Sequence, residues 1–327
     1  MRAHLSAPFG HRNCGVTQMG LMTLVLLFMG SVVAAVAVLI WYRKRSLLQF
    51  AIPAAATISA GWFISAVFRW DFVGHEYFLL PLVLAIALVG ALVFIYQSGN
   101  IVAQVRRGWV PNLVLLIGVA LPFALPASLY VEFGEAPDEV ELTFPLPEGR
   151  WYVAQGGNAL ILNHHRRIWA QRYALNITLL DETGKRADAS GVGDPEDYFA
   201  YGAIVYAPCT GAVAAVEDGH TANADPGYLA ANPAGNFVAI YCDHADTTVL
   251  AAHLQPGLPV APQERVRTGD IIGRVGETGR TSEPHLHIHA VAGRHTDPES
   301  LLLRAKGIPM SFDGRVLIRN DVFDVKF

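Results

Sequence analysis

Histidines near the C-terminus alternate with other residues at a spacing that suits a metal site. The segment 283–290 reads EPHLHIHA and places His285, His287 and His289 two residues apart. In a β-strand, side chains at i, i+2 and i+4 point to the same face, so the three imidazoles line one surface while the leucine and isoleucine between them enter the core. Imidazole is a preferred zinc ligand. The alternative is the solvated polar face of an amphipathic strand.

Two further histidine groups favour the metal interpretation. Asn163-His164-His165 lies far upstream, and His253 ends an apolar run. A catalytic zinc site needs three protein ligands and an open position for water. It also needs a group that takes the proton of this water and one that stabilises the tetrahedral intermediate. Histidines from three strands or strand ends could supply most of that set.

The elements that must position these histidines are short β-strands. Runs of β-type residues alternate with glycine-containing turns such as Gly269-Asp270 and 276–279. The pattern predicts a mostly β domain with antiparallel sheets. The expected strands are 174–180, 203–207, 211–216, 236–242, 247–253, 271–275, 285–291 and 316–319.

The first part of the chain has a different composition. The 327 residues are 52% hydrophobic, with a mean hydropathy of +0.33, and the apolar excess lies between residues 20 and 130. Crossing a bilayer takes about 20 apolar residues in a helix. Four segments are long enough, namely 20–41, 47–68, 78–97 and 110–130. The sequence therefore predicts a four-helix transmembrane domain over 1–130, a linker over 131–148, and a β domain over 149–327.

Charges in the short loops predict the orientation of these spans. Arg43, Lys44 and Arg45 lie between the first two spans, and Arg106 and Arg107 lie between the last two. The positive-inside rule places both loops in the cytoplasm, with the β domain on the other side. The expected location is the cytoplasmic membrane, with the lipid bilayer as a partner and the C-terminal domain extracytoplasmic. Two arginines in the N-terminal tail favour the opposite orientation.

Net charge and cysteine content add two constraints. A formal net charge of −4 gives no reason to expect nucleic-acid binding, which would require a basic face. Cys209 and Cys242 both lie in the β domain. They could form a disulfide in an oxidising compartment or remain as two buried thiols.

Taken together, the motifs resemble those of the lysostaphin/LytM-type zinc metallopeptidases, over roughly residues 150 to 300. The resemblance rests on segments in a matching order: 163–165 (NHH), 171–176 (QRYALN), 207–213 (APCTGAV), 235–240 (GNFVAI), 252–254 (AHL), 266–273 (VRTGDIIG) and 278–287 (TGRTSEPHLH). It implies the duplicated hybrid motif, or barrel-sandwich, architecture for the β domain.

The resemblance also implies a zinc ligand set. The second histidine of the H-x-H pair, His287, is expected to bind Zn²⁺ together with His165, with His164 as the alternative. In the family an aspartate supplies the remaining ligand, and Asn176 stands in its place here. A neutral amide oxygen can coordinate zinc, but it does not cancel charge on the ion as a carboxylate does.

Two further histidines take catalytic roles by the same resemblance. His285 is expected to be the catalytic histidine, and His253 to polarise the water or the developing oxyanion. A tyrosine usual two residues before the latter is replaced by Ala251. The family assigns no standard role to His289, which is left as a supporting or surface residue.

The resemblance implies a zinc metalloendopeptidase that hydrolyses peptide bonds of peptidoglycan stem peptides or cross-bridges. The alternative is a catalytically degenerate zinc- or cell-wall-binding module with a scaffold or regulatory role. No sequence feature identifies an activator or divisome-type partner. A transporter function is disfavoured because Arg69, Asp71 and Glu76 lie at span boundaries, whereas transport paths carry ionisable groups within the membrane.

Overall fold

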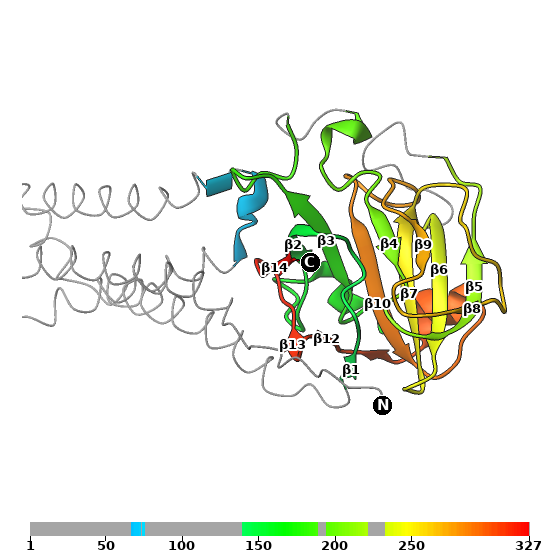
Figure 1. The fold of residues 1–327 in the computed structure, drawn as a ribbon. Coiled ribbons are helices and arrows are strands. Elements are labelled where there is room, and N and C mark those ends of the chain that lie inside the picture. Colours follow the sequence, from blue (N-terminus) through cyan, green and yellow to red (C-terminus); the bar gives the residue numbers. More distant parts are fainter. Residues whose placement is uncertain (1–66, 73, 76–138, 189–193, 222–232, 327) are drawn as a thin grey trace, which may run out of the picture. The chain divides into compact units, whose positions relative to one another are not determined.

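The computed structural model describes residues 67–72, 74–75, 139–188, 194–221 and 233–326. The chain divides into two compact units, one made of 1–63 with 78–126 and the other of 64–77 with 127–327. All elements described below belong to the second unit (Figure 1).

The second unit consists mainly of short strands joined by turns. The strands are β1 (Val140–Glu141), β2 (Gly149–Gln155), β3 (Leu175–Leu180), β4 (Ile204–Tyr206), β5 (Gly211–Glu217), β6 (Asn236–Cys242), β7 (Thr247–Leu254), β8 (Arg265–Val266), β9 (Ile271–Arg274), β10 (Leu286–Ala292), β11 (Gly307–Ile308), β12 (Met310–Phe312), β13 (Arg315–Val316) and β14 (Val322–Val325). The helical turns are η1 (Trp70–Phe72), η3 (His164–Arg167), η4 (Pro195–Asp197) and η5 (Ser300–Arg304). The predicted mostly β character is confirmed.

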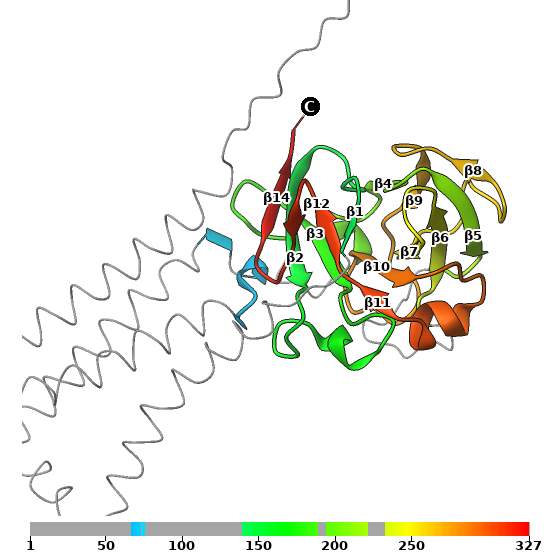
Figure 2. The same ribbon diagram turned by 90° about the horizontal axis from the view of Figure 1, so that it is seen from below.

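The strands form one long antiparallel sheet and two small ones. The long sheet has the order β14-β2-β3-β10-β7-β6-β5-β8, and β11 pairs with β10. Strands β4 and β9 form an antiparallel pair, and β1-β12-β13 form the third sheet, in which β1 and β12 run parallel. Figure 2 shows β14 and β8 at opposite ends of the long sheet, with β3 and β10 between them.

Alternating side chains of the central strands enter two apolar clusters, one on each face. Leu286 and Ile288 of β10 join a large cluster that also contains Val205 of β4 and Ile272 of β9. The opposite face of the central strands packs against a smaller cluster that includes Leu301 of η5. Burial on both faces explains why these strands are nearly continuous apolar runs. Each cluster contributes on the order of 25 cal/mol per Å² of buried apolar surface.

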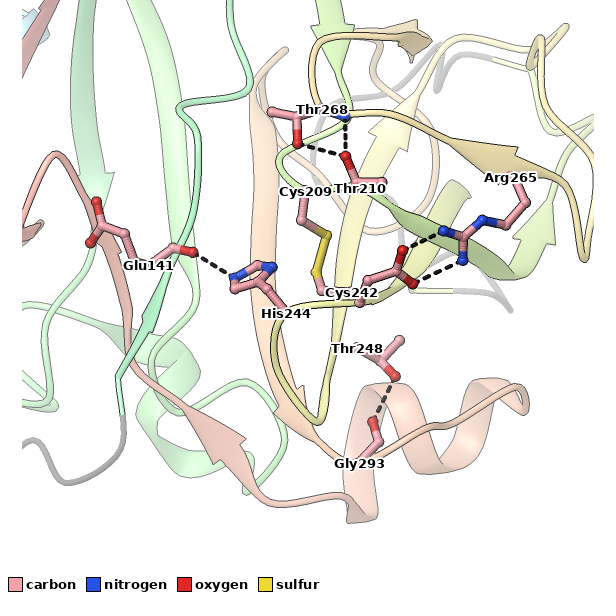
Figure 3. Close-up of a disulfide and its surroundings, with 10 residues drawn as sticks. Glu141, Cys209, Thr210, Cys242, His244, Thr248, Arg265, Thr268 and Gly293 are labelled. Atoms are coloured by element: carbon pink, nitrogen blue, oxygen red, sulfur yellow. Dashed lines mark hydrogen bonds and ion pairs between the residues drawn. A yellow bond between two sulfur atoms is a disulfide. The ribbon is translucent and has the colours of Figure 1, made fainter.

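A disulfide joins Cys209, in the segment between β4 and β5, to Cys242 at the end of β6 (Figure 3). This resolves the choice between a disulfide and two thiols. Gly211 follows the first cysteine, and a Cβ there would collide with the backbone carbonyl of Tyr241. The glycine therefore lets the two backbones approach closely enough for the sulfurs to meet. Arg265 of β8 pairs with Asp243 beside the disulfide.

The predicted four-helix transmembrane domain, and the integral-membrane location that depended on it, are corrected by the structure. Among the described residues, no helix is long and apolar enough to cross a membrane. The described helical turns have three to five residues, against the ~20 needed. The predicted spans 20–41, 47–68, 78–97 and 110–130 lie outside the described residues, except for Val67 and Phe68.

Candidate metal centre

The candidate site lies where β3, β10 and β7 run next to one another in the sheet. In the antiparallel register, His287 on β10 faces Asn176 on β3 and Ala252 on β7. Directly opposed residues of an antiparallel pair have Cβ atoms about 5 Å apart, so their side chains meet on one face. His253 follows Ala252 on β7. Pairing of three strands that are far apart in sequence thus gathers the predicted residues.

The amide of Asn176 is the meeting point of two imidazoles. Its Oδ1 lies 3.0 Å from His165 Nε2 and 3.0 Å from His287 Nδ1. The rings of His165 and His287 approach edge to face, with centroids 4.6 Å apart. Three side chains predicted as metal ligands therefore converge. His164, the alternative ligand, is exposed and packs its ring on that of His165.

His165 is positioned by a buried asparagine that caps its helical turn. Asn163 Oδ1 accepts the backbone N–H of His165, and Asn163 Nδ2 donates to the carbonyls of Gly157 and Ala174. The asparagine is fully buried. It therefore ties the turn η3 to both ends of the loop that precedes β3. The sequence marks Asn163 as part of a motif, but its role depends on contacts made only after folding.

His285 presents one ring nitrogen that has no partner. Its Nδ1 donates to the carbonyl of Glu283 at 2.7 Å, and its buried Nε2 makes no hydrogen bond with any described residue. His253 is arranged alike, with Nδ1 donating to the carbonyl of Thr278 at 2.7 Å. The two rings lie with centroids 4.9 Å apart. Each histidine is thus held with its Nε2 lone pair directed away from the backbone.

The backbone of His253 adopts a conformation that is rare for a residue with a side chain. Its φ is +63°, in the left-handed region. The N–H of His253 donates to Ala234, and its carbonyl accepts from the N–H of Gly276. These two hydrogen bonds offset the local strain, which typically costs about 1–3 kcal/mol. Strain of this kind is often found at functional sites, and no sequence signal predicts it here.

Burial keeps the histidines of the site neutral. It lowers the pKa of His285, places the pKa values of His165 and His287 well below normal, and lowers the pKa of His253 to about 3. Neighbouring imidazoles lower the pKa values of His165, His287 and His253 further, because a second positive charge would be repelled. Neutral imidazoles retain the lone pair that a metal or a proton requires.

The donor atoms fit a zinc ion in geometry and differ from the usual set in charge. In tetrahedral zinc with bonds of roughly 2.1 Å, ligand atoms lie about 3.4 Å apart. His165 Nε2 and His287 Nδ1 each lie 3.0 Å from Asn176 Oδ1, close to this spacing. Within the described ranges, no three His, Cys, Asp or Glu side chains are grouped to hold a metal. A third donor beside His165 and His287 would have to be the amide of Asn176, and all three side chains are neutral.

A buried ion network, which the sequence did not indicate, supports the segment that carries His285. The carboxylate of Glu283 accepts from Arg69 Nη2 and from Arg186 Nε, each at 2.7 Å. Asp71, fully buried, pairs with Arg69 at 2.6 Å. Burial alone would raise the pKa of Glu283, but the two guanidinium groups hold it below its usual value. The backbone carbonyl of Glu283 accepts the hydrogen bond from His285 Nδ1, so the network that holds Glu283 also holds the imidazole ring of His285 in place.

A second acidic residue flanks the site. Glu277 is 3% exposed and lies between Gly276 and Thr278, whose backbones both bond to His253. Burial, followed by the nearby charge of Glu283, raises the pKa of Glu277 to about 7. Sequence reasoning missed this residue, because an isolated glutamate in a glycine-containing turn is normally solvated.

The comparisons with known proteins give one family match. Residues 197–298 match the model of Peptidase family M23. The match includes His253, His285 and His287, whereas His165 and Asn176 precede it. The comparison with curated proteins gives no match.

Among solved structures, the chain is similar to a zinc-containing peptidase from Vibrio cholerae, with 18% identity, a TM-score of 0.31, and 52% of this chain and 39% of that one covered. It is also similar to Helicobacter pylori Csd3, with 15% identity, a TM-score of 0.26, and 58% and 36% covered. The catalytic domain of the antimicrobial peptidase lysostaphin from Staphylococcus simulans gives 19% identity, a TM-score of 0.21, and 33% and 77% covered. The chain spans about two fifths of the first two proteins.

Proposed function

We propose that this chain is a zinc metalloendopeptidase, and the match of residues 197–298 to the model of Peptidase family M23 supports this proposal. His165, Asn176 and His287 hold the metal. The observation that carries this proposal is the convergence of His165 Nε2 and His287 Nδ1 on Asn176 Oδ1, each at 3.0 Å. When bound, zinc polarises the scissile carbonyl and makes its bound water acidic near neutral pH.

His285 and His253 act on the attacking water and its proton. The free Nε2 of His285 accepts a proton from the attacking water, since its Nδ1–H is committed to the carbonyl of Glu283. His253, also fixed through Nδ1, directs its other nitrogen to the same region. Because this nitrogen is an acceptor, it takes a hydrogen bond from the attacking water and so orients the water before attack.

The proposed substrate is a peptide bond in peptidoglycan stem peptides or cross-bridges. This rests on the resemblance of the motifs to lysostaphin-type enzymes and on the family match. One of the similar solved structures is the catalytic domain of the antimicrobial peptidase lysostaphin.

The neutral amide of Asn176 favours a second candidate, a zinc- or cell-wall-binding module without turnover. Three neutral donors leave the full charge of the ion uncompensated, which weakens metal binding relative to a set with one carboxylate. The site would then bind peptide without cutting it.

Metal analysis combined with digestion distinguishes the two candidates. The full chain is purified, its zinc content is measured, and it is incubated with isolated sacculi beside its Asn176→Asp and His285→Gln variants. The enzyme proposal predicts zinc and released peptides for the natural sequence. It also predicts a loss of about 10²–10⁴-fold in rate for His285→Gln with zinc retained. Cleavage only by Asn176→Asp would establish the binding module instead.

A further inference from the structure

His289, the third histidine of the alternating segment, forms a hydrogen-bonded chain behind His287. His289 is 1% exposed, so solvent does not supply its partners. Its Nε2 lies 3.0 Å from the carbonyl oxygen of Leu301, and its Nδ1 lies 3.0 Å from His287 Nε2. The rings of the two histidines meet edge to face, with centroids 5.2 Å apart.

Proton positions along this chain follow from what each atom can do. A carbonyl oxygen only accepts, so the Nε2 of His289 must carry the hydrogen that it donates to Leu301. The ring is 1% exposed, and burial disfavours a charged imidazole, so the ring is neutral and its Nδ1 is an acceptor. The Nε2 of His287 must therefore carry a hydrogen and donate it to His289. In a neutral imidazole this leaves the Nδ1 of His287 as a lone pair.

That lone pair points at another acceptor. Nδ1 of His287 lies 3.0 Å from the Oδ1 of Asn176, which His165 also approaches. Two acceptor atoms at this distance repel unless a cation lies near both or the amide is turned to present its nitrogen. The relay thus creates an electron-rich point where a metal would be held.

The carbonyl that starts the relay is available because of the unusual turn η5. In this π-type turn the N–H of Ala305 bonds to Ser300, five residues back. The carbonyls of Leu301 and Leu302 then accept from side chains, namely His289 and Gln171 Nε2. Gln171 lies in the loop between His165 and β3. One turn therefore supports both histidines that approach Asn176.

We propose that His289 is a positioning residue that locks His287 in its Nε2–H tautomer and so directs its Nδ1 lone pair into the metal centre. The inference rests on the proposed function only in naming a metal as the ligand of that lone pair. A ligating histidine commonly donates its other N–H to an acceptor, and loss of such a partner costs about 10- to 100-fold in metal affinity. Here a second histidine, oriented by a backbone carbonyl, takes that role.

The test compares the full chain with His289→Phe and His289→Gln. Glutamine can donate to Leu301 and accept from His287, whereas phenylalanine fills the space without either bond. The tautomer of His287 is read from ¹⁵N chemical shifts of histidine-labelled, metal-free protein. Zinc affinity is read by chelator competition. His244→Gln is the control, because His244 also contacts a carbonyl, that of Glu141, but lies outside the site (Figure 3).

We expect the Nε2–H tautomer in the natural chain and in His289→Gln, and mixed tautomers in His289→Phe with zinc bound about 10- to 100-fold more weakly. An Nδ1–H tautomer of His287 in the natural metal-free chain would overturn the proposal, even if the phenylalanine variant failed to fold. An unchanged tautomer and affinity in folded His289→Phe would overturn it as well. The tautomer measurement needs no bound zinc, so failure of the proposed function would appear separately, as a natural chain that binds none.

Discussion

Backbone carbonyls fix the protonation pattern of the site at the scale of single residues. The Nδ1–H groups of His285 and His253 donate to the carbonyls of Glu283 and Thr278, and the Nε2–H of His289 donates to Leu301. Each bond leaves the other nitrogen of its ring as an acceptor. The three rings therefore present acceptor nitrogens, which is what the proposed metal binding and proton transfer require.

The residues of this site could be predicted from the sequence more easily than their partners could. Alternation in 285–289 predicted one histidine face and one apolar face, and the packing of Leu286 and Ile288 in the core confirms the apolar face. The carbonyl acceptors could not be foreseen, because folding alone decides which backbone group meets a side chain. The same holds for Asn163, whose partners are set by the path of the loop.

The raised pKa of Glu277 predicts that this residue lowers the stability of the folded chain at high pH and not at low pH. Its pKa is raised in the folded state to about 7, so the unfolded chain loses this proton first as pH rises above about 4.5. Glu277 therefore has no effect on stability below that pH and destabilises the fold increasingly up to about pH 7. Glu277→Gln should raise the melting temperature at pH 8 and change it little at pH 4.5, as measured by calorimetry. The exposed Glu182→Gln is the control, and equal effects at both pH values would contradict the assignment.

At the scale of elements, the strands were predicted best where apolar runs end at clear turns. The predicted strand 236–242 coincides with β6, and 247–253 differs from β7 by one residue. The predicted strand 316–319 is wrong beyond Val316. Asp321 accepts the N–H of Ile318 there and bends the chain into a turn. Strand β2 was not predicted, because β14, one of the strands with which it pairs, lies far away in the sequence.

Removing one charge from the buried ion network should lower the stability of the fold more than breaking a surface ion pair does. Glu283→Gln removes the charge that faces Arg69 and Arg186, of which the latter is 4% exposed. Leaving buried cations without a partner typically costs about 3–5 kcal/mol, and we expect a loss in the lower part of this range, because Asp71 remains. Denaturant unfolding measures it. Asp243→Asn, which breaks the exposed pair with Arg265, should have little effect, and equal losses would contradict the role of the network.

The disulfide predicts a further effect on stability, namely a loss when the bond is removed. The bond closes a loop with a sequence separation of 33 residues, for which the chain-entropy estimate is about 3–4 kcal/mol. Replacing Cys209 and Cys242 by alanine should lower the melting temperature by roughly 10 °C. The natural chain under reducing conditions should have the same melting temperature as the double variant. A reduced natural chain that melts like the oxidised one would show that the bond does not constrain the fold.

For the molecule as a whole, the site depends on segments that local sequence patterns do not connect. Residues 67–72 pack on the β domain through Arg69, and the 131–148 segment contributes Val140 and Leu146 to the core. Sequence reasoning correctly predicted a mostly β domain. It could not place these segments, because their pairing is non-local. The predicted membrane domain is corrected for the described residues, which contain no spanning helix.

We propose that His165, Asn176 and His287 hold one metal ion. X-ray absorption at the zinc edge tests this directly. The full chain is loaded with one equivalent of zinc and compared with its His165→Ala and His287→Ala variants. The account predicts one bound zinc with only nitrogen and oxygen neighbours, including two imidazoles, and its loss in either variant. Zinc that remains bound with an unchanged spectrum in both variants would contradict the account, as would a natural chain that binds none.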